Sequence, residues 1–383
     1  MRRYGRIFAC IFLCVIFGTV RVQGGEERRV EGSTQDRLLE EMDLDQVQAL
    51  LDGALTQEHF SLLEAVKKIM TGEKVLSKET LQEFVQGLFF SEYLQMKSTI
   101  LRILVLVFAG AVFLNFTSVF QEAQIAQVGF YVVYLMLFLI LMNLFRHLSL
   151  ELSHTLEWMT EFMKSLMPSY LMAVTAASGT SAAAVFYEGV IFLVWLIQWV
   201  LLTLLLPGTN LYVLLELVNH LSKEEMLSKM AELMETVISW GLKTMLGMVV
   251  GLQVVKNLIA PILDTLRRSV IGRTASAIPG IGNAVNMVTE LVLTSAVLVR
   301  NSLGTAVLMA LILVGAGPLL KYAGMSLLFR LLAALCQPIS DRRMVRALGT
   351  MGEGCAVLIR ILVTAQVLGM LVFVILMVSF GGG

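Results

Sequence analysis

Long apolar stretches separated by short polar ones dominate the chain after about residue 98. A helix needs about 20 mostly apolar residues to cross the hydrocarbon core of a bilayer. The stretches that approach this requirement lie at about 99–119, 128–145, 169–186, 188–206, 237–257, 281–299, 303–320 and 356–380. The pattern predicts an all-α, polytopic membrane protein with about eight spans. The third stretch is rich in small residues, so it either packs closely against its neighbours or forms a re-entrant or broken hairpin with the fourth.

Two further segments have the pattern of amphipathic helices that lie in the membrane interface. In residues 146–168 an apolar stripe is formed by Leu148, Leu152, Leu156, Met159 and Met163. In residues 221–240 the corresponding stripe is formed by Met226, Met230, Leu233 and Val237. The apolar stretches 209–221 and 323–336 are too short to span and are predicted to be interfacial or half-inserted.

The N-terminal region divides into two predicted segments. Residues 1–24 combine a basic start, a short apolar run and small residues, which is the pattern of a signal peptide; an uncleaved anchor is the alternative. Residues 25–97 carry about half of the acidic residues and form a small extracytoplasmic helical segment, in which Gly72 is expected to end a helix. Residues 98–383 are then the multi-span membrane domain.

Basic residues in the loops suggest an orientation for these spans. With the N-terminal segment outside, eight spans place the loops 256–273 and 321–355 in the cytoplasm, and these loops are the more basic ones. Both ends of the chain would then lie outside.

Composition excludes several classes of function. The chain is 57% hydrophobic and 15% charged, and its formal net charge is zero, so no basic field for nucleic acid exists. There is no CxxC, HExxH or GxxxxGK[ST] motif, and no histidine follows Ser178 in a later span to serve it as a base. We therefore expect no catalytic centre, no metal and no cofactor. Cys336 and Cys355 are inert apolar thiols or a disulfide pair.

A polar stripe near the C-terminal half is the candidate functional lining. Asn283, Asn286 and Glu290 share one helix face, and Glu290 lies inside an otherwise apolar span. An ionisable residue at this depth either lines an aqueous path or holds helices together. Arg300 to Gly304 should then be a tight link between two spans.

Glycine and proline mark other positions along the spans. Gly247 and Gly251 form a GxxxG pattern, which favours close helix contact but also arises by chance. Pro318, with Gly315, is expected to bend the seventh span, and Pro207 with Gly208 to end the fourth.

Several short motifs, in this order and spacing, resemble the stage III sporulation protein AE family. They are FMKSLMP at 162–168, SAAAVF at 181–186, LVNHLS at 217–222, WGL at 240–242, IPGIG at 278–282, RNSLG at 300–304 and PISDR at 338–342. The resemblance covers nearly all of the chain from about residue 30.

The resemblance implies a multi-pass protein made in the mother cell and inserted in the outer membrane around the forespore. It implies a membrane subunit of a channel or secretion-like complex that links the two cells and is required for late forespore development. The implied partners are the other sporulation stage III A operon proteins, including a secretion-type ATPase, and a forespore-made protein. A stand-alone secondary transporter that uses Glu290 is the competing hypothesis. For contact with the ATPase, we predict the turn that contains Pro338, Asp341, Arg342 and Arg343.

Overall fold

The computed structural model describes residues 44–55, 60–73, 101–105, 107–110, 112, 123–178, 192–221, 226–271 and 282–379. Within these ranges, the side chains of 123–127, 173–178, 252–293, 296 and 375–379 are outside the description. The described elements are all helical, which confirms the predicted all-α class for this part of the chain. The predicted signal peptide lies outside the described residues.

Very long helices make up the molecule. Helix α6 (Ala123–Ser178) has 56 residues, α10 (Gly282–Cys336) has 55, α9 (Ser228–Ile271) has 44 and α11 (Arg342–Ser379) has 38. At a rise of 1.5 Å per residue, the two longest are each about 80 Å long. The hydrocarbon core of a bilayer is only about 30 Å thick. These helices therefore extend well beyond a single membrane crossing.

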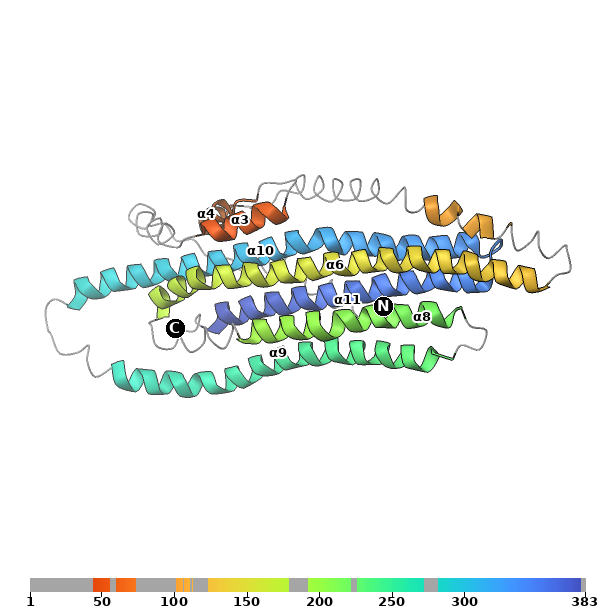
Figure 1. The fold of residues 1–383 in the computed structure, drawn as a ribbon. Coiled ribbons are helices and arrows are strands. Elements are labelled where there is room, and N and C mark those ends of the chain that lie inside the picture. Colours follow the sequence, from red (N-terminus) through yellow and green to blue (C-terminus); the bar gives the residue numbers. More distant parts are fainter. Residues whose placement is uncertain are drawn as a thin grey trace.

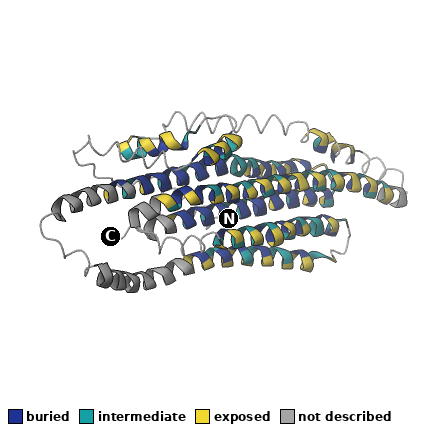
Figure 2. Ribbon diagram, turned by 60° about the vertical axis from the view of Figure 1, so that its left-hand side comes forward, coloured by how far each residue is buried: buried dark blue, intermediate teal, exposed yellow. Residues whose placement is uncertain are grey.

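The long helices form an elongated bundle (Figure 1). α10 packs against α6 and α11, while α8 (Leu206–Asn219) packs against α9 and α11. Buried residues form stripes along the helices and exposed residues alternate with them (Figure 2). One hydrophobic core runs through the whole bundle, because these stripes face one another.

Within the described residues, five helices are long and apolar enough to cross a membrane, whereas about eight spans were predicted for the whole chain. They are Val128–Met172, Phe192–Asn219, Ser228–Gly251, Val297–Cys336 and Arg342–Val374. Of the predicted first span, only part is described, including the apolar helix Leu101–Gly110, and the rest lies outside the described residues. Several predicted spans are joined in one described helix, because hydropathy falls wherever a helix carries charged side chains, although its backbone continues.

The two long helices α6 and α10 show this error most clearly. α6 joins the predicted second span, the predicted surface helix 146–168 and most of the third span. The apolar stripe of the surface helix is buried in the bundle core rather than laid in the membrane interface. α10 passes through Arg300, Asn301 and Gly304 without a break, so the predicted link is a helical segment. Glutamate, lysine and arginine are good helix formers, which keeps the α6 backbone helical. In α10 the segment is held by packing, because Arg300, Ser302 and Leu303 are buried.

The continuity of α10 favours a different orientation from the predicted one. The basic loops 256–273 and 321–355 were both assigned to the cytoplasm. The structure places the end of α9 and the start of α10 at one end of the bundle, and the turn between α10 and α11 at the other (Figure 1). A helix that crosses once has its two ends on opposite sides, so only one of the two loops can be cytoplasmic.

Pro207 does not end the fourth span. The helix runs from Phe192 to Asn219, and a π-helical turn, η1 (Leu201–Leu205), precedes the proline. Proline has no N–H to donate to the carbonyl four residues earlier and its ring crowds that carbonyl. In the π turn, the N–H of Leu206 donates to the carbonyl of Leu201, five residues back. The hydroxyl of Thr209 donates to the carbonyl of Leu205 at 2.8 Å, which further satisfies this turn.

Two short helices from the N-terminal region pack on α6 and α10. These are α3 (Asp45–Ala54) and α4 (Leu62–Thr71). The Gln48 side chain joins them, donating to the Phe60 carbonyl and accepting from the Leu62 N–H, both at 2.9 Å. Trp158 of α6 donates its indole N–H to the Leu50 carbonyl at 2.9 Å. Gly72 ends α4 with φ = 76°, as the sequence predicted.

Side-chain hydrogen bonds to backbone carbonyls connect the long helices. Tyr322 donates to Leu148 at 3.2 Å, Tyr134 to Leu217 at 2.6 Å and Ser326 to Gly352 at 2.7 Å. Gln366 of α11 donates to the carbonyl of Leu311 on α10 and lies directly over Gly315. Gly315 thus provides the space for the Gln366 amide, whereas the sequence had suggested a bend there.

Gly315→Ala should destabilise the bundle by about 1–3 kcal/mol, because the added methyl group overlaps the Gln366 side chain. Thermal unfolding of the purified full-length protein in detergent measures this loss of stability. Gly324→Ala is the matched control on the same helix, since nothing lies within 4 Å of a Cβ there. Adding Gln366→Ala to Gly315→Ala should restore most of the loss. A Gly315→Ala protein as stable as the control would contradict this packing.

Single cysteines at Ser276 and Ser340 should be labelled from opposite sides of the membrane by an impermeant maleimide. The reason is that these positions flank a helix, α10, that is continuous from Gly282 to Cys336. Cys336 and Cys355 are buried, and Cys10 and Cys14 lie outside the described residues, so a chain with Cys10→Ser and Cys14→Ser is the parent for both variants and gives the background. Labelling of both positions from the same side would show that α10 turns back within the membrane.

Candidate functional site

Ion pairs connect several of the helices in the described part of the structure. Gly354 of α11 packs against Phe145 of α6 and Val213 of α8, which brings these three helix segments together. The residues of the ion pairs and the charges close to them form a set that we call the charged layer: Glu151, Glu216, His220, Glu235, Lys321, Glu353 and Arg360. Charges inside apolar helices are costly unless they are paired or solvated, so their clustering identifies the main candidate site.

On the α6–α10 side, Glu151 and Lys321 form an ion pair. The Lys321 ammonium lies 3.0 and 3.1 Å from the two carboxylate oxygens of Glu151. Both side chains are largely shielded, with 19% of Lys321 and 32% of Glu151 exposed. His147, one turn before Glu151, places its Nε2 3.3 Å from the same carboxylate. This pair joins the two longest helices.

On the opposite side, the layer is formed by α8, α9 and α11. Arg360 lies 3.6 Å from Glu235, and His220 lies 3.7 Å from Glu216. The imidazole of His220 also makes a 3.0 Å hydrogen bond with the Thr350 hydroxyl. The buried Tyr212 is within electrostatic reach of Glu216, Glu235, Glu353 and Arg360. Carboxylates outnumber arginines in this half.

The charged layer can pair charges and hold water, but it has no metal-binding arrangement. Among the residues that the structure describes, no three histidine, cysteine or acidic side chains converge closely enough to hold a metal ion. The expected absence of a cofactor remains an expectation.

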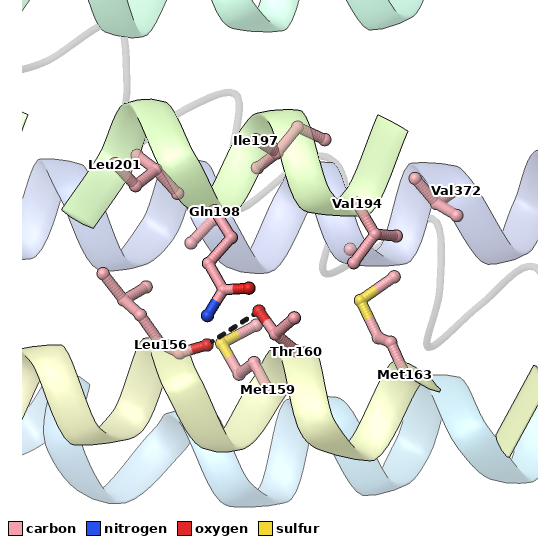
Figure 3. A pocket seen from close by; sticks show the side chains of 11 residues that line it. Leu156, Met159, Thr160, Met163, Val194, Ile197, Gln198, Leu201 and Val372 are labelled. Atoms are coloured by element: carbon pink, nitrogen blue, oxygen red, sulfur yellow. Dashed lines mark hydrogen bonds between the residues drawn. The ribbon is translucent and has the colours of Figure 1, made fainter. Parts of the chain in front are cut away.

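A small cavity lies between α6, α11 and the helical segment 192–200, which precedes the π turn. Its volume is about 30 Å³, with room for about two water molecules. Most of its lining is apolar and includes Met159 and Met163. Gln198 points into it toward Thr160, whose hydroxyl donates to the Leu156 carbonyl at 3.1 Å (Figure 3). The cavity is too small for an organic ligand.

The predicted polar lining lies on the N-terminal part of α10. One continuous helix contains Asn283, Asn286 and Glu290. Their backbone positions therefore lie on one face of this helix, as predicted. Their side chains lie outside the described part of the structure, and their role as a lining stays a prediction.

The predicted partner contact lies at the turn between α10 and α11, and the structure divides its residues into two groups. Asp341 caps α11 by accepting the N–H of Arg343 at 2.8 Å. The Arg343 guanidinium lies 3.5 Å from the ring centre of Phe130 and 3.3 Å from Asp341. Asp341 and Arg343 therefore stabilise the chain's own fold. By contrast, Pro338 and Arg342 are exposed.

Sequence reasoning missed most of the charged layer. Arg360 lies in the predicted span 356–380, where a lone cation in an apolar run is the same signal that singled out Glu290. Lys321 fell in the predicted loop 321–355, and Glu151 in the predicted surface helix 146–168. Their pairing needed knowledge of which helices are neighbours.

Taken together, these helices define a polytopic α-helical membrane protein whose candidate site is built from paired charges. The chain belongs to the stage III sporulation protein AE family, whose model matches residues 60–381. The family resemblance read from the sequence is thereby confirmed.

A curated relative extends this comparison. Stage III sporulation protein AE of Bacillus subtilis (strain 168) is 22% identical over 294 residues, which cover 76% of this chain and 73% of that protein. No solved structure matches the chain. Family membership supports a role in sporulation.

Lys321→Met should lower the free energy of unfolding, because it leaves the Glu151 carboxylate without its cation. We expect a loss of about 1–3 kcal/mol, which lies between the losses typical of breaking an exposed ion pair and a buried one. Lys229→Met is the matched control, since Lys229 pairs with Glu232 on an exposed helix face, and it should leave stability unchanged. Adding Glu151→Gln to Lys321→Met should recover part of the loss in thermal unfolding. Equal effects of the two lysine changes would show that the layer contributes no pairing energy.

Proposed function

We propose that this protein is a membrane subunit of a channel or secretion-like complex that links the mother cell and the forespore and is required for late forespore development. The observation that carries the proposal is the family match over residues 60–381. The role is non-enzymatic: the chain contributes membrane helices and contact surfaces, and other subunits supply the energy.

The dimensions of the bundle support a role in an assembly. Helices of about 80 Å leave tens of ångströms of each helix outside a bilayer of about 30 Å. A protein of this shape presents helix surfaces to water on at least one side of the membrane. Such surfaces suit contact with soluble and membrane partners at once.

The proposed partners are the other sporulation stage III A operon proteins, including a secretion-type ATPase, and a forespore-made protein. The proposed location is the mother-cell membrane around the forespore. Basic residues lie towards both ends of α10, and we place the end that carries Arg342, Arg343 and Arg346 in the cytoplasm as part of this proposal. An ATPase in the cytoplasm would then meet Pro338 and Arg342, the exposed part of the turn.

A tagged full-length chain recovered from detergent-solubilised sporulating cells should bring the other operon proteins with it. Arg342→Glu should reduce recovery of the ATPase by about threefold to tenfold, because it reverses an exposed charge at the proposed contact. Arg146→Glu, an equal change at an exposed position on α6, should leave recovery intact. Both variants should insert normally, since neither side chain is buried.

Two outcomes would contradict the proposal. Recovery of the protein alone, under conditions that preserve another membrane complex, would exclude an assembly and favour a stand-alone transporter. Unchanged ATPase recovery with Arg342→Glu, alongside recovery of the other proteins, would exclude this turn as the contact while retaining the assembly.

A further inference from the structure

A cavity of about 30 Å³ lies where the helical segment 192–200 packs on α6 and α11 (Figure 3). This segment is the first part of the helix Phe192–Asn219 and leads into the π turn η1. Met159 and Met163 of α6 and Gly369 of α11 contribute to the cavity wall. All residues of the lining belong to the described part of the chain, so the cavity is a feature of the packing between these helices.

Two polar side chains face each other across this space. Figure 3 shows the side-chain amide of Gln198 directed at Thr160, whose hydroxyl donates to the Leu156 carbonyl at 3.1 Å. This bond uses the only proton of the hydroxyl but leaves a lone pair that can accept a hydrogen bond. It is also the only hydrogen bond drawn among the lining residues in Figure 3, so Gln198 and Thr160 face each other without a direct hydrogen bond.

The Gln198 amide therefore needs hydrogen-bond partners other than these side chains. Gln198 is half-buried, and an amide group that loses contact with bulk water is unfavourable unless other groups bond to it. A gap between two polar groups that is too wide for a direct hydrogen bond is commonly closed by water. A water molecule needs roughly 10–15 Å³ of such a cavity, so this one has room for about two.

We propose that the cavity is a water-binding site, in which about two water molecules bridge the Gln198 amide and the Thr160 hydroxyl. Water both donates and accepts, so it can bond to either end of the amide and donate to the free lone pair of Thr160. The rest of the lining consists of leucine, isoleucine, valine, alanine, methionine and glycine. These side chains form no hydrogen bonds with water, so they confine the bridge to the polar side of the cavity.

The bridge fixes the rotation of the segment 192–200 on α6. The other side chains that line the cavity are apolar and do not select one rotation of the segment. Hydrogen bonds are directional, so a water bridge favours the rotation in which Gln198 faces α6. That rotation leaves Trp195 and Trp199 on the exposed side of the segment. The water site depends on this packing alone and is independent of the function proposed above.

Replacing Gln198 with leucine gives opposite results for a hydrated and a dry cavity. In a hydrated cavity, Gln198→Leu removes one end of the bridge and should lower the melting temperature of the purified full-length protein by about 1–4 °C. In a dry cavity, the same change would replace an unbonded amide with an apolar side chain and would raise the melting temperature. Gln46→Leu, the same exchange at an exposed position of α3, is the matched control and should leave it unchanged.

A second substitution tests whether the two polar groups are linked. Thr160→Val should add little to the effect of Gln198→Leu, because both changes break the same bridge and coupled sites are not additive. Thr155→Val is the matched control. Thr155 makes the same kind of bond on α6, donating to the Glu151 carbonyl at 3.0 Å, but it does not line the cavity. The effect of Thr155→Val should add to that of Gln198→Leu.

Hydroxyl-radical footprinting of the unmodified full-length chain detects bound water directly. Radicals formed from bound water oxidise nearby methionine sulfur to the sulfoxide, so Met159 and Met163 should be oxidised at least about threefold faster than Met167. Met167 is the control, because it lies on the same helix, is similarly buried and does not line the cavity.

The three measurements decide between a hydrated and a dry cavity. A fall in melting temperature with Gln198→Leu, non-additivity with Thr160→Val and fast oxidation of Met159 and Met163 support the water site. A Gln198→Leu protein at least as stable as the unmodified chain would overturn the proposal. Additive effects of the two substitutions, or oxidation of both methionines no faster than that of Met167, would equally overturn it.

Discussion

Long apolar helices can slide past one another, because leucine, valine and methionine fill similar volumes at successive turns. Directional polar contacts remove this freedom, since a hydrogen bond or ion pair is satisfied in one register only. In this bundle, the Glu151–Lys321 pair and the Tyr322 to Leu148 hydrogen bond fix α10 against α6. The Gln366 contact with Leu311 fixes α11 against α10. The charged layer and the cavity both depend on this register.

Much of the fold class could be read from the sequence, but the number of elements could not. Apolar stretches identified the right regions of the chain, and Gly72 ended a helix as expected. The errors arose where a helix carries charged side chains without ending: α6 does so at His154 and Glu157, which are exposed, and α10 at Arg300, which is buried. Hydropathy reports what surrounds a side chain, whereas helix continuity depends on backbone hydrogen bonds, and a chain of Glu, Lys and Arg maintains these as well as leucine does.

Part of the candidate site could likewise be predicted from the sequence, and part could not. A lone ionisable residue in an apolar run is visible in the sequence, and Arg360 could have been found in this way. Its partner Glu235 lies on another helix, in a segment first assigned to the membrane surface. Likewise, the basic turn before α11 was visible as a cluster, but the roles of Asp341 and Arg343 depend on Phe130, which is distant in sequence. Pairing across helices is tertiary information that no local pattern contains.

The π turn before Pro207 adds one residue to a single helical cycle. Residues on either side of it therefore follow the same axis with faces rotated by about 100° from the phase of an uninterrupted α-helix. This phase shift lets the segment 192–200 direct Gln198 toward α6 while α8 keeps Tyr212 among the charges of α9 and α11. The π turn before Pro207 thus lets one helix pack against α6 with its first half and against α9 and α11 with its second half. Removing one residue from this turn would rotate one half of the helix away from its neighbours.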